Sequence, residues 1–127
     1  MIESIPTGID DALAFRVSGK ITKQEMTAVL AEAREKIAAH GSIVLLEEID
    51  SFEGVEWGAL VEEFRYLFEI GISNIRKAAV VTDKKWIGRI VAIEDKVFRG
   101  IEMKCFPKKD RDAAIAFLQE PVAKPKV

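Results

Sequence analysis

The chain has 127 residues, of which 49% are hydrophobic and 31% are charged, and its formal net charge at pH 7 is −2. This size suits one domain with a single core, and the composition is that of a soluble globular protein. Because the chain has no basic excess, bulk binding of nucleic acid is disfavoured. The longest unbroken apolar run, 113–118, is far shorter than the ~20 residues that a membrane-spanning helix needs.

The amino-terminal residues and the cysteine count favour a cytoplasmic location. The first residues include early acids and lack the basic and apolar regions of a signal peptide. The single cysteine, Cys105, excludes an intramolecular disulfide and a zinc site built from several thiolates. We therefore predict a cytoplasmic protein and leave open a peripheral association with the inner membrane.

The apolar periodicity predicts nine elements in the order β-β-α-β-α-β-α-β-α. The first two are short strands at 2–5 and 12–18, joined by a turn at Pro6-Thr7-Gly8. Alternation in the second strand predicts one buried face and one partly exposed face. The later elements are a helix at 22–40, a strand at 43–49, a helix at 57–70, a strand at 77–82, a helix at 84–99, a strand at 101–106 and a helix at 109–120.

Local signals support several of these elements. Thr22 and Glu25 form a capping-box pattern at the start of the first helix, and Gly41 is a natural end for it. The apolar run at 43–46 shows no alternation, as expected for a strand covered on both faces. Glu47 and Glu48 then predict the point where this strand reaches solvent.

The repeated strand–helix units predict an α/β domain with a five-stranded, mostly parallel sheet and four helices. The first strand, which follows a short turn, is expected to be antiparallel. The domain should span 1–120. Residues 121–127 contain two prolines and no apolar periodicity, so we expect a disordered tail.

The order and spacing of four segments resemble the SpoIIAA-like family, and in particular a bacterial group of short stand-alone proteins. This family is related to the STAS domains of anti-sigma-factor antagonists and shares its fold with CRAL-TRIO lipid-binding domains. The segments that carry the resemblance are Met1–Glu3, Phe15–Thr22, Leu46–Gly54 and Ala78–Trp86. The resemblance implies a domain without catalytic activity that holds an apolar ligand or associates loosely with membranes.

The chain departs from the STAS pattern at the regulatory position. The resemblance implies a phosphorylated serine at the start of the second helix, where this chain has Val55, Glu56 and Trp57. Ser51 is the nearest hydroxyl, but a phosphate there would be repelled by neighbouring acids. The phosphorylation switch is therefore not transferred to this chain, although the chain could still act as a regulatory protein-interaction domain.

An acidic loop follows the third strand, at the carboxyl end where α/β folds place their sites. Its acids are candidate contacts for a partner protein, and oxygen ligands of this kind also suit a hard cation such as Mg²⁺. A solvated loop near a helix amino terminus explains the same residues. We predict no metal and no cofactor. The partner-contact candidates are Asp50, Glu53 and Glu56.

The helix at 84–99 is basic, contains a tryptophan and has a broad apolar face, which is typical of a helix at a membrane interface. A core-facing amphipathic helix with a basic outer side gives the same pattern. The membrane-contact candidates are Lys84, Lys85, Trp86 and Arg89.

The helix at 57–70 also carries apolar residues beyond its main stripe. It could form a ligand pocket with the helix at 84–99, or a homodimer interface, while ordinary core packing explains the same surplus. The ligand-binding candidates are Trp57, Val61, Phe64, Trp86 and Ile90.

No residue pattern indicates a catalytic centre. His40, the single histidine, lies at the end of the first helix, and Cys105 lies in a predicted strand. Both are better explained by packing or by the helix dipole than by catalysis. We therefore hypothesise first a binding module for an apolar or lipid-like ligand. Second comes a regulatory protein-interaction domain, and third a cation-dependent enzyme.

Overall fold

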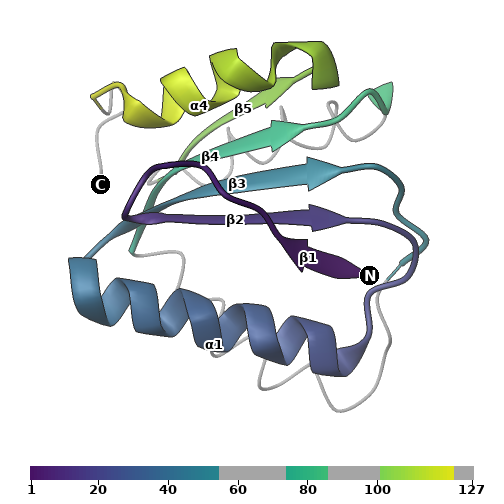
Figure 1. The fold of residues 1–127 in the computed structure, drawn as a ribbon, viewed down its shortest axis with the longest axis horizontal. Helices are drawn as coiled ribbons and strands as arrows, with labels where there is room; N and C mark the ends of the chain where they lie inside the picture. Colours follow the sequence, from purple (N-terminus) through teal and green to yellow (C-terminus); the bar gives the residue numbers. More distant parts are fainter. Residues whose placement is uncertain (55–73, 86–100, 122–127) are drawn as a thin grey trace.

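The computed structural model describes residues 1–54, 74–85 and 101–121. These residues contain a five-stranded sheet in which the strands lie in sequence order (Figure 1). Strand β1 pairs antiparallel with β2, and the remaining neighbours pair in parallel. The sheet is therefore mixed, and the predicted five strands and antiparallel first strand are confirmed. The strands are β1 (Ile2–Ser4), β2 (Ala12–Val17), β3 (Ile43–Ile49), β4 (Ile75–Val81) and β5 (Glu102–Phe106).

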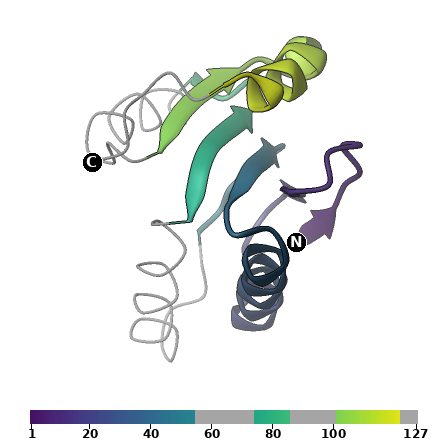
Figure 2. The ribbon, with the colours of Figure 1, turned by 90° about the vertical axis from the view of Figure 1, so that its left-hand side faces the viewer.

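Two of the four predicted helices lie within the described residues, on opposite faces of the sheet (Figure 2). They are α1 (Lys23–His40) and α4 (Arg111–Gln119), the latter preceded by the short 3-10 helix η1 (Lys108–Asp110). The predicted helix at 57–70 and nearly all of the one at 84–99 lie outside the described residues. So do residues 122–127 of the predicted tail.

The capping box at the start of α1 is confirmed. Thr22 Oγ accepts a hydrogen bond from the Glu25 amide at 3.1 Å, and Glu25 Oε1 accepts one from the Thr22 amide at 3.0 Å. Glu25 also makes a contact that the local pattern does not predict. Its Oε2 accepts a hydrogen bond from the amide of Ile2 at 2.6 Å. The bonds from the Thr22 and Ile2 amides hold the pKa of the Glu25 carboxyl below its ordinary value.

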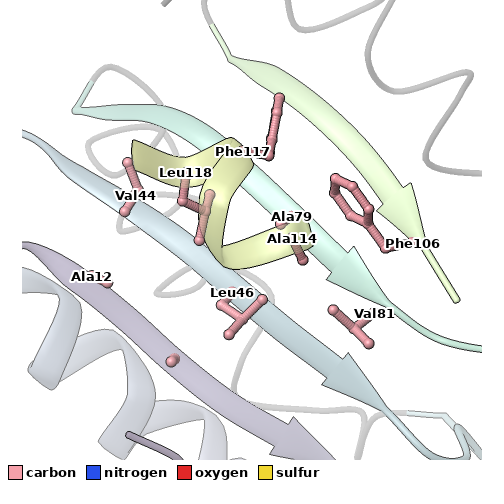
Figure 3. Close-up of a cluster of buried hydrophobic side chains, with 10 residues drawn as sticks. Ala12, Val44, Leu46, Ala79, Val81, Phe106, Ala114, Phe117 and Leu118 are labelled. Atoms are coloured by element: carbon pink, nitrogen blue, oxygen red, sulfur yellow. The ribbon is translucent and has the colours of Figure 1, made fainter. Parts of the chain in front are cut away.

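The α4 face of the sheet carries the larger described core cluster (Figure 3). Small residues of the strands leave room for Phe117 and Leu118 of α4, and the rings of Phe106 and Phe117 lie 5.7 Å apart. Ile5 and Ile9 of the β1–β2 connection pack against the same cluster. The buried members are Ala12, Ala14, Val44, Leu46, Ala79, Val81, Phe106, Ala114, Phe117 and Leu118.

The opposite face of β2 is also buried, so the prediction that one of its faces is partly exposed is wrong for most of the strand. Leu13, Phe15 and Val17 form a second cluster under the apolar stripe of α1, while Ala12 and Ala14 face the α4 side. Both faces are covered because α1 packs on one of them, and Ile5 and Ile9 pack against the cluster on the other. The alternation identifies the two faces correctly, but Ala14, on the side that it predicts to be partly exposed, is buried.

Strand β3 is covered on both faces, as its uninterrupted apolar run predicts. Ile43, Val44 and Leu46 have no exposed surface. The prediction that the strand reaches solvent at its two glutamates is wrong for Glu48, which is only 9% exposed. Glu48 lies on the α4 face of the sheet, where side chains from distant parts of the sequence cover it, as described below.

A buried lysine holds the carboxyl end of α4 against the sheet. Lys77, at the start of β4, is 1% exposed, and its Nζ donates a hydrogen bond to the carbonyl oxygen of Phe117 at 2.8 Å. The same nitrogen lies 3.2 Å from the carboxylate of Glu102 and 4.3 Å from the centre of the Phe117 ring. Since α4 has no basic residue in its own last turn, Lys77 supplies from the sheet the cation that a helix carboxyl end favours.

Candidate functional site at the carboxyl ends of the strands

The carboxyl ends of the four parallel strands meet at one edge of the sheet, where α/β proteins usually place their sites. Four loop segments converge there. They follow β2, β3, β4 and β5, at residues 18–21, 50–54, 82–85 and 107–110.

The loop at residues 50–54, called here the acidic loop, is tied to the segment after β2 by backbone hydrogen bonds. The amides of Asp50 and Glu53 donate to the carbonyls of Val17 and Gly19, each at 2.9 Å. The carbonyl of Gly54 accepts the amide of Ile21, also at 2.9 Å. These bonds continue the parallel pairing of β2 and β3 beyond the strands and fix the loop backbone.

Ser51 takes part in the same connection through its side chain. Its Oγ accepts a hydrogen bond from the amide of Gly19 at 2.8 Å. Gly19 has a φ of +66°, a left-handed conformation that glycine adopts without strain. The hydroxyl therefore has a structural role in holding the loop.

A row of alternating charges crosses the first three strands at this edge. Glu3 is the register partner of Arg16, and Arg16 is the register partner of Glu48. The Arg16 guanidinium lies 3.4 Å from the Glu48 carboxylate and 4.0 Å from that of Glu3. Each carboxylate of the row is therefore beside a guanidinium on the neighbouring strand.

The segment after β5 adds two more cations. The Arg111 guanidinium lies 3.9 Å from Glu48, and Lys108 forms an ion pair with Asp50, which also lies 3.9 Å from Arg16. In sequence Glu48 and Asp50 have no basic neighbour, but in the fold three cations surround these two acids. Sequence reasoning missed this because the partners lie 32 or more residues away from Glu48 and Asp50. Strand register brings Arg16 to Glu48, and the packing of η1 and α4 brings Lys108 and Arg111.

The outward side of the acidic loop carries exposed side chains. Phe52 is 37% exposed, and Glu53 is exposed beside it. Of the three predicted partner contacts, Asp50 is thus held by ion pairs, Glu53 is exposed, and Glu56 lies outside the described residues. The structure brings Asp50 and Glu53 together on one fixed loop.

The predicted membrane-contact residues are only partly described. Lys84 and Lys85 are exposed after the end of β4, and Trp86 and Arg89 lie outside the described residues. The Lys108 amide donates to Asp83 Oδ1 at 3.0 Å, which places the segment after β5 beside these lysines. The predicted ligand-binding residues all lie outside the described residues: Trp57, Val61, Phe64, Trp86 and Ile90.

The part of the chain that the structure describes gives no support to a metal site or to a catalytic role for Cys105 or His40. No group of three or more histidine, cysteine or acidic residues there could hold a metal ion. Cys105 is half-buried, and burial raises the pKa of its thiol, which fits the packing role. His40 is exposed at the end of α1. No described helix has the length and apolar character that crossing a membrane requires.

Comparison with known proteins identifies the family and the fold of this chain. One solved structure that is similar to this chain is an uncharacterized protein of the DUF3478 family with a SpoIIAA-like fold, from Shewanella loihica PV-4. It shares 21% sequence identity with a TM-score of 0.68, over 93% of this chain and 92% of that one, which shows the fold alone. No match was found among curated proteins. The family model for SpoIIAA-like proteins matches residues 12–119, and the chain therefore belongs to the SpoIIAA-like family.

Proposed function

We propose that this domain is a binding module without catalytic activity that contacts a partner protein through the acidic loop. The observation that carries this proposal is the fixed backbone of residues 50–54 beneath an exposed aromatic ring and an exposed carboxylate. A loop that is ordered before binding loses little conformational entropy when a partner docks.

The charge distribution indicates what kind of partner surface fits. Asp50 and Glu48 are neutralised by cations of the same molecule, so they are less available to a partner. Glu53 is exposed next to Phe52. A partner that offers an apolar pocket rimmed by lysine or arginine would complement this pair, because aromatic anchors dominate interface energy and charges at the rim guide association.

Affinity capture from extracts of the host, followed by mass spectrometry, tests this function. Proteins retained by the wild-type chain should be lost with Glu53→Lys and with Phe52→Ala. Glu120→Lys is the matched control, because it makes the same charge change at an exposed position beyond the carboxyl end of α4. Equal retention by Glu53→Lys and wild type would show that this loop is not the contact.

We propose as a second function that the domain binds an apolar or lipid-like ligand and associates peripherally with membranes. The observation that favours it is the exposure of Lys84 and Lys85 at the same edge as Lys108. Near an anionic surface each lysine contributes about 1 kcal/mol to binding, so a small group of lysines gives reversible attachment.

Sedimentation with vesicles of phosphatidylglycerol and phosphatidylcholine tests the membrane contact. The double variant Lys84→Glu/Lys85→Glu should sediment less than wild type, and high salt should have the same effect. The control Lys23→Glu/Arg34→Glu makes the same charge change on α1 and should sediment like wild type. Indifference to both salt and the first variant would contradict membrane contact.

The apolar ligand is tested separately by native mass spectrometry of protein purified from its own host. A small molecule that co-purifies and is released by organic extraction would support ligand binding. A ligand-free species would favour the protein-interaction function, and its mass would distinguish a monomer from a dimer.

A further inference from the structure

The carboxyl edge of the sheet carries exposed charges in an order that the strands set. Its four loop segments follow β2, β3, β4 and β5, which lie side by side in that order (Figure 1). The segment after β3 exposes Glu53, and the segment after β4 exposes Lys84 and Lys85. Because neighbouring strands lie ~4.8 Å apart, an acidic segment and a basic segment are adjacent on this edge.

These exposed charges are not used in ion pairs within the described chain. Among residues 1–54, 74–85 and 101–121, neither Glu53 nor the two lysines has an ion-pair partner. Asp50 differs, because it pairs with Lys108 and lies near Arg16. The charges at positions 53, 84 and 85 therefore remain available to a partner.

A two-fold rotation makes this edge complementary to itself. An axis along the sheet normal, between the ends of β3 and β4, turns a second copy end to end and reverses the order of its strands. The segment after β3 of each copy then faces the segment after β4 of the other. An interface of this kind uses the same patch on both copies, so the contact of Glu53 with the two lysines occurs twice.

The outer segments of the edge do not oppose this arrangement. The same rotation brings the segment after β2 opposite the segment after β5. Lys20, which is exposed after β2, then faces Lys109 and Asp110, which are exposed after β5 and carry opposite charges. The outer contact is therefore close to neutral, and the orientation is selected by the inner segments.

Phe52 adds apolar surface beside Glu53. Its side chain is 37% exposed on a loop whose backbone is fixed by hydrogen bonds to the segment after β2. Aromatic side chains supply much of the energy of protein interfaces, whereas charge pairs at the rim select the partner and its orientation. The edge thus combines an apolar anchor with complementary charges.

We propose that the partner of the acidic loop is a second copy of this chain. In the resulting two-fold dimer, Glu53 of each copy lies against Lys84 and Lys85 of the other, and Phe52 of both copies lies in the interface. The proposal rests on the proposed function, because it keeps the acidic loop as the contact and names the partner. The site is complete only in the dimer, since its cationic rim comes from the second copy.

Sedimentation velocity of the wild-type chain tests the dimer. The expected result is a dimer that forms with a micromolar Kd and weakens as salt is added, because salt screens exposed charges. A chain that stays monomeric at millimolar concentration in low salt would overturn the proposal. A dimer whose Kd does not change with salt would overturn it too, and neither result depends on the folding of a variant.

A charge swap tests which residues meet. Glu53→Lys and Lys84→Glu/Lys85→Glu each place like charges at both symmetric contacts, so each should weaken the dimer about tenfold. In an equimolar mixture of the two, the reversed position 53 faces the reversed positions 84 and 85, and the unchanged residues face each other. Both contacts are again attractive, and the mixture should dimerise more tightly than either variant alone.

Glu120→Lys is the matched control for this swap, because it makes the same charge change as Glu53→Lys at an exposed position away from the edge. It should dimerise like wild type. Mixed with the double lysine variant, it leaves one of the two contacts repulsive, so this mixture should dimerise more weakly than the one that contains Glu53→Lys. Equal dimerisation of the two mixtures would contradict the assigned contact.

The dimer and the proposed function fail in different ways. A monomeric wild-type chain that captures a different protein in a Glu53-dependent manner would overturn the dimer and leave the acidic loop as the contact. A monomeric chain without Glu53-dependent capture would overturn both.

Discussion

The side-chain nitrogen of Lys77 lies 2.8 Å from the carbonyl oxygen of Phe117, and this contact joins the start of β4 to the last turn of α4. The lysine is almost completely buried, and its other neighbour is the carboxylate of Glu102 on β5. One cation thus donates a hydrogen bond to a helix carbonyl and forms an ion pair with a carboxylate, and it connects α4 to two adjacent strands.

Replacing Lys77 by methionine should destabilise the protein by about 3 kcal/mol, because it keeps the apolar stem but leaves Glu102 without its counter-ion. Urea denaturation measures the loss. Adding Glu102→Gln to this variant should recover part of the stability, since a neutral amide is less costly to leave unpaired. A Lys77→Met protein as stable as wild type would show that the buried contact contributes nothing net.

Glu48 should matter more for stability than the exposed acid of the neighbouring loop. Glu48→Ala leaves two guanidinium groups, Arg16 and Arg111, beside an emptied and nearly buried position. Because both arginines are about one-third exposed, water offsets part of the loss, and we expect about 1–2 kcal/mol. Glu53→Ala is the control, expected within about 0.5 kcal/mol of wild type by urea denaturation.

Glu25 should make the stability of the protein depend on pH in the acidic range. Its pKa is lowered in the folded protein, so its contribution is present above the unfolded pKa and is lost as pH falls through the folded value. The urea midpoint of Glu25→Gln should therefore lie below that of wild type at neutral pH, and the gap should narrow as the pH falls below 4.5, the ordinary pKa of a glutamate carboxyl.

Glu35→Gln is the control for loss of a carboxylate on the same helix, because Glu35 is exposed. Its midpoint at neutral pH should remain close to wild type. A gap between Glu25→Gln and wild type that stayed constant down to strongly acidic pH would contradict the assigned role of the carboxylate.

We expect position 19 to require glycine because of its backbone conformation, and not because a larger side chain would lack space. Its φ is +66°, and a Cβ there would meet Glu53 Oε2 at 3.8 Å, an ordinary van der Waals distance. Gly19→Ala should cost about 1 kcal/mol, and Gly19→Asn should cost less because asparagine tolerates the left-handed region. Hydrogen exchange at the Glu53 amide, which bonds to the Gly19 carbonyl, should speed up in the alanine variant. Equal stability of all three proteins would refute the argument.

Features that depend on residues close together in the chain can be predicted from the sequence. The capping box of Thr22 and Glu25, the burial of both faces of β3 and the succession of strands along the chain are all predictable, because each follows from local hydrogen bonding or from apolar periodicity. The family resemblance was likewise readable from four short segments, and the family model confirms it.

The environments of the charged residues, in contrast, depend on the tertiary fold. Glu48 was expected at the solvent boundary and Lys77 was not singled out at all, yet both are buried against partners far away in sequence. The capping-box pattern predicts the contact of Glu25 within α1, but its second oxygen also accepts the amide of Ile2 in β1. A charged residue looks the same in sequence whether it is solvated or paired. Its environment depends on strand register and on which segment covers each face, and these are set by the packing of the whole sheet.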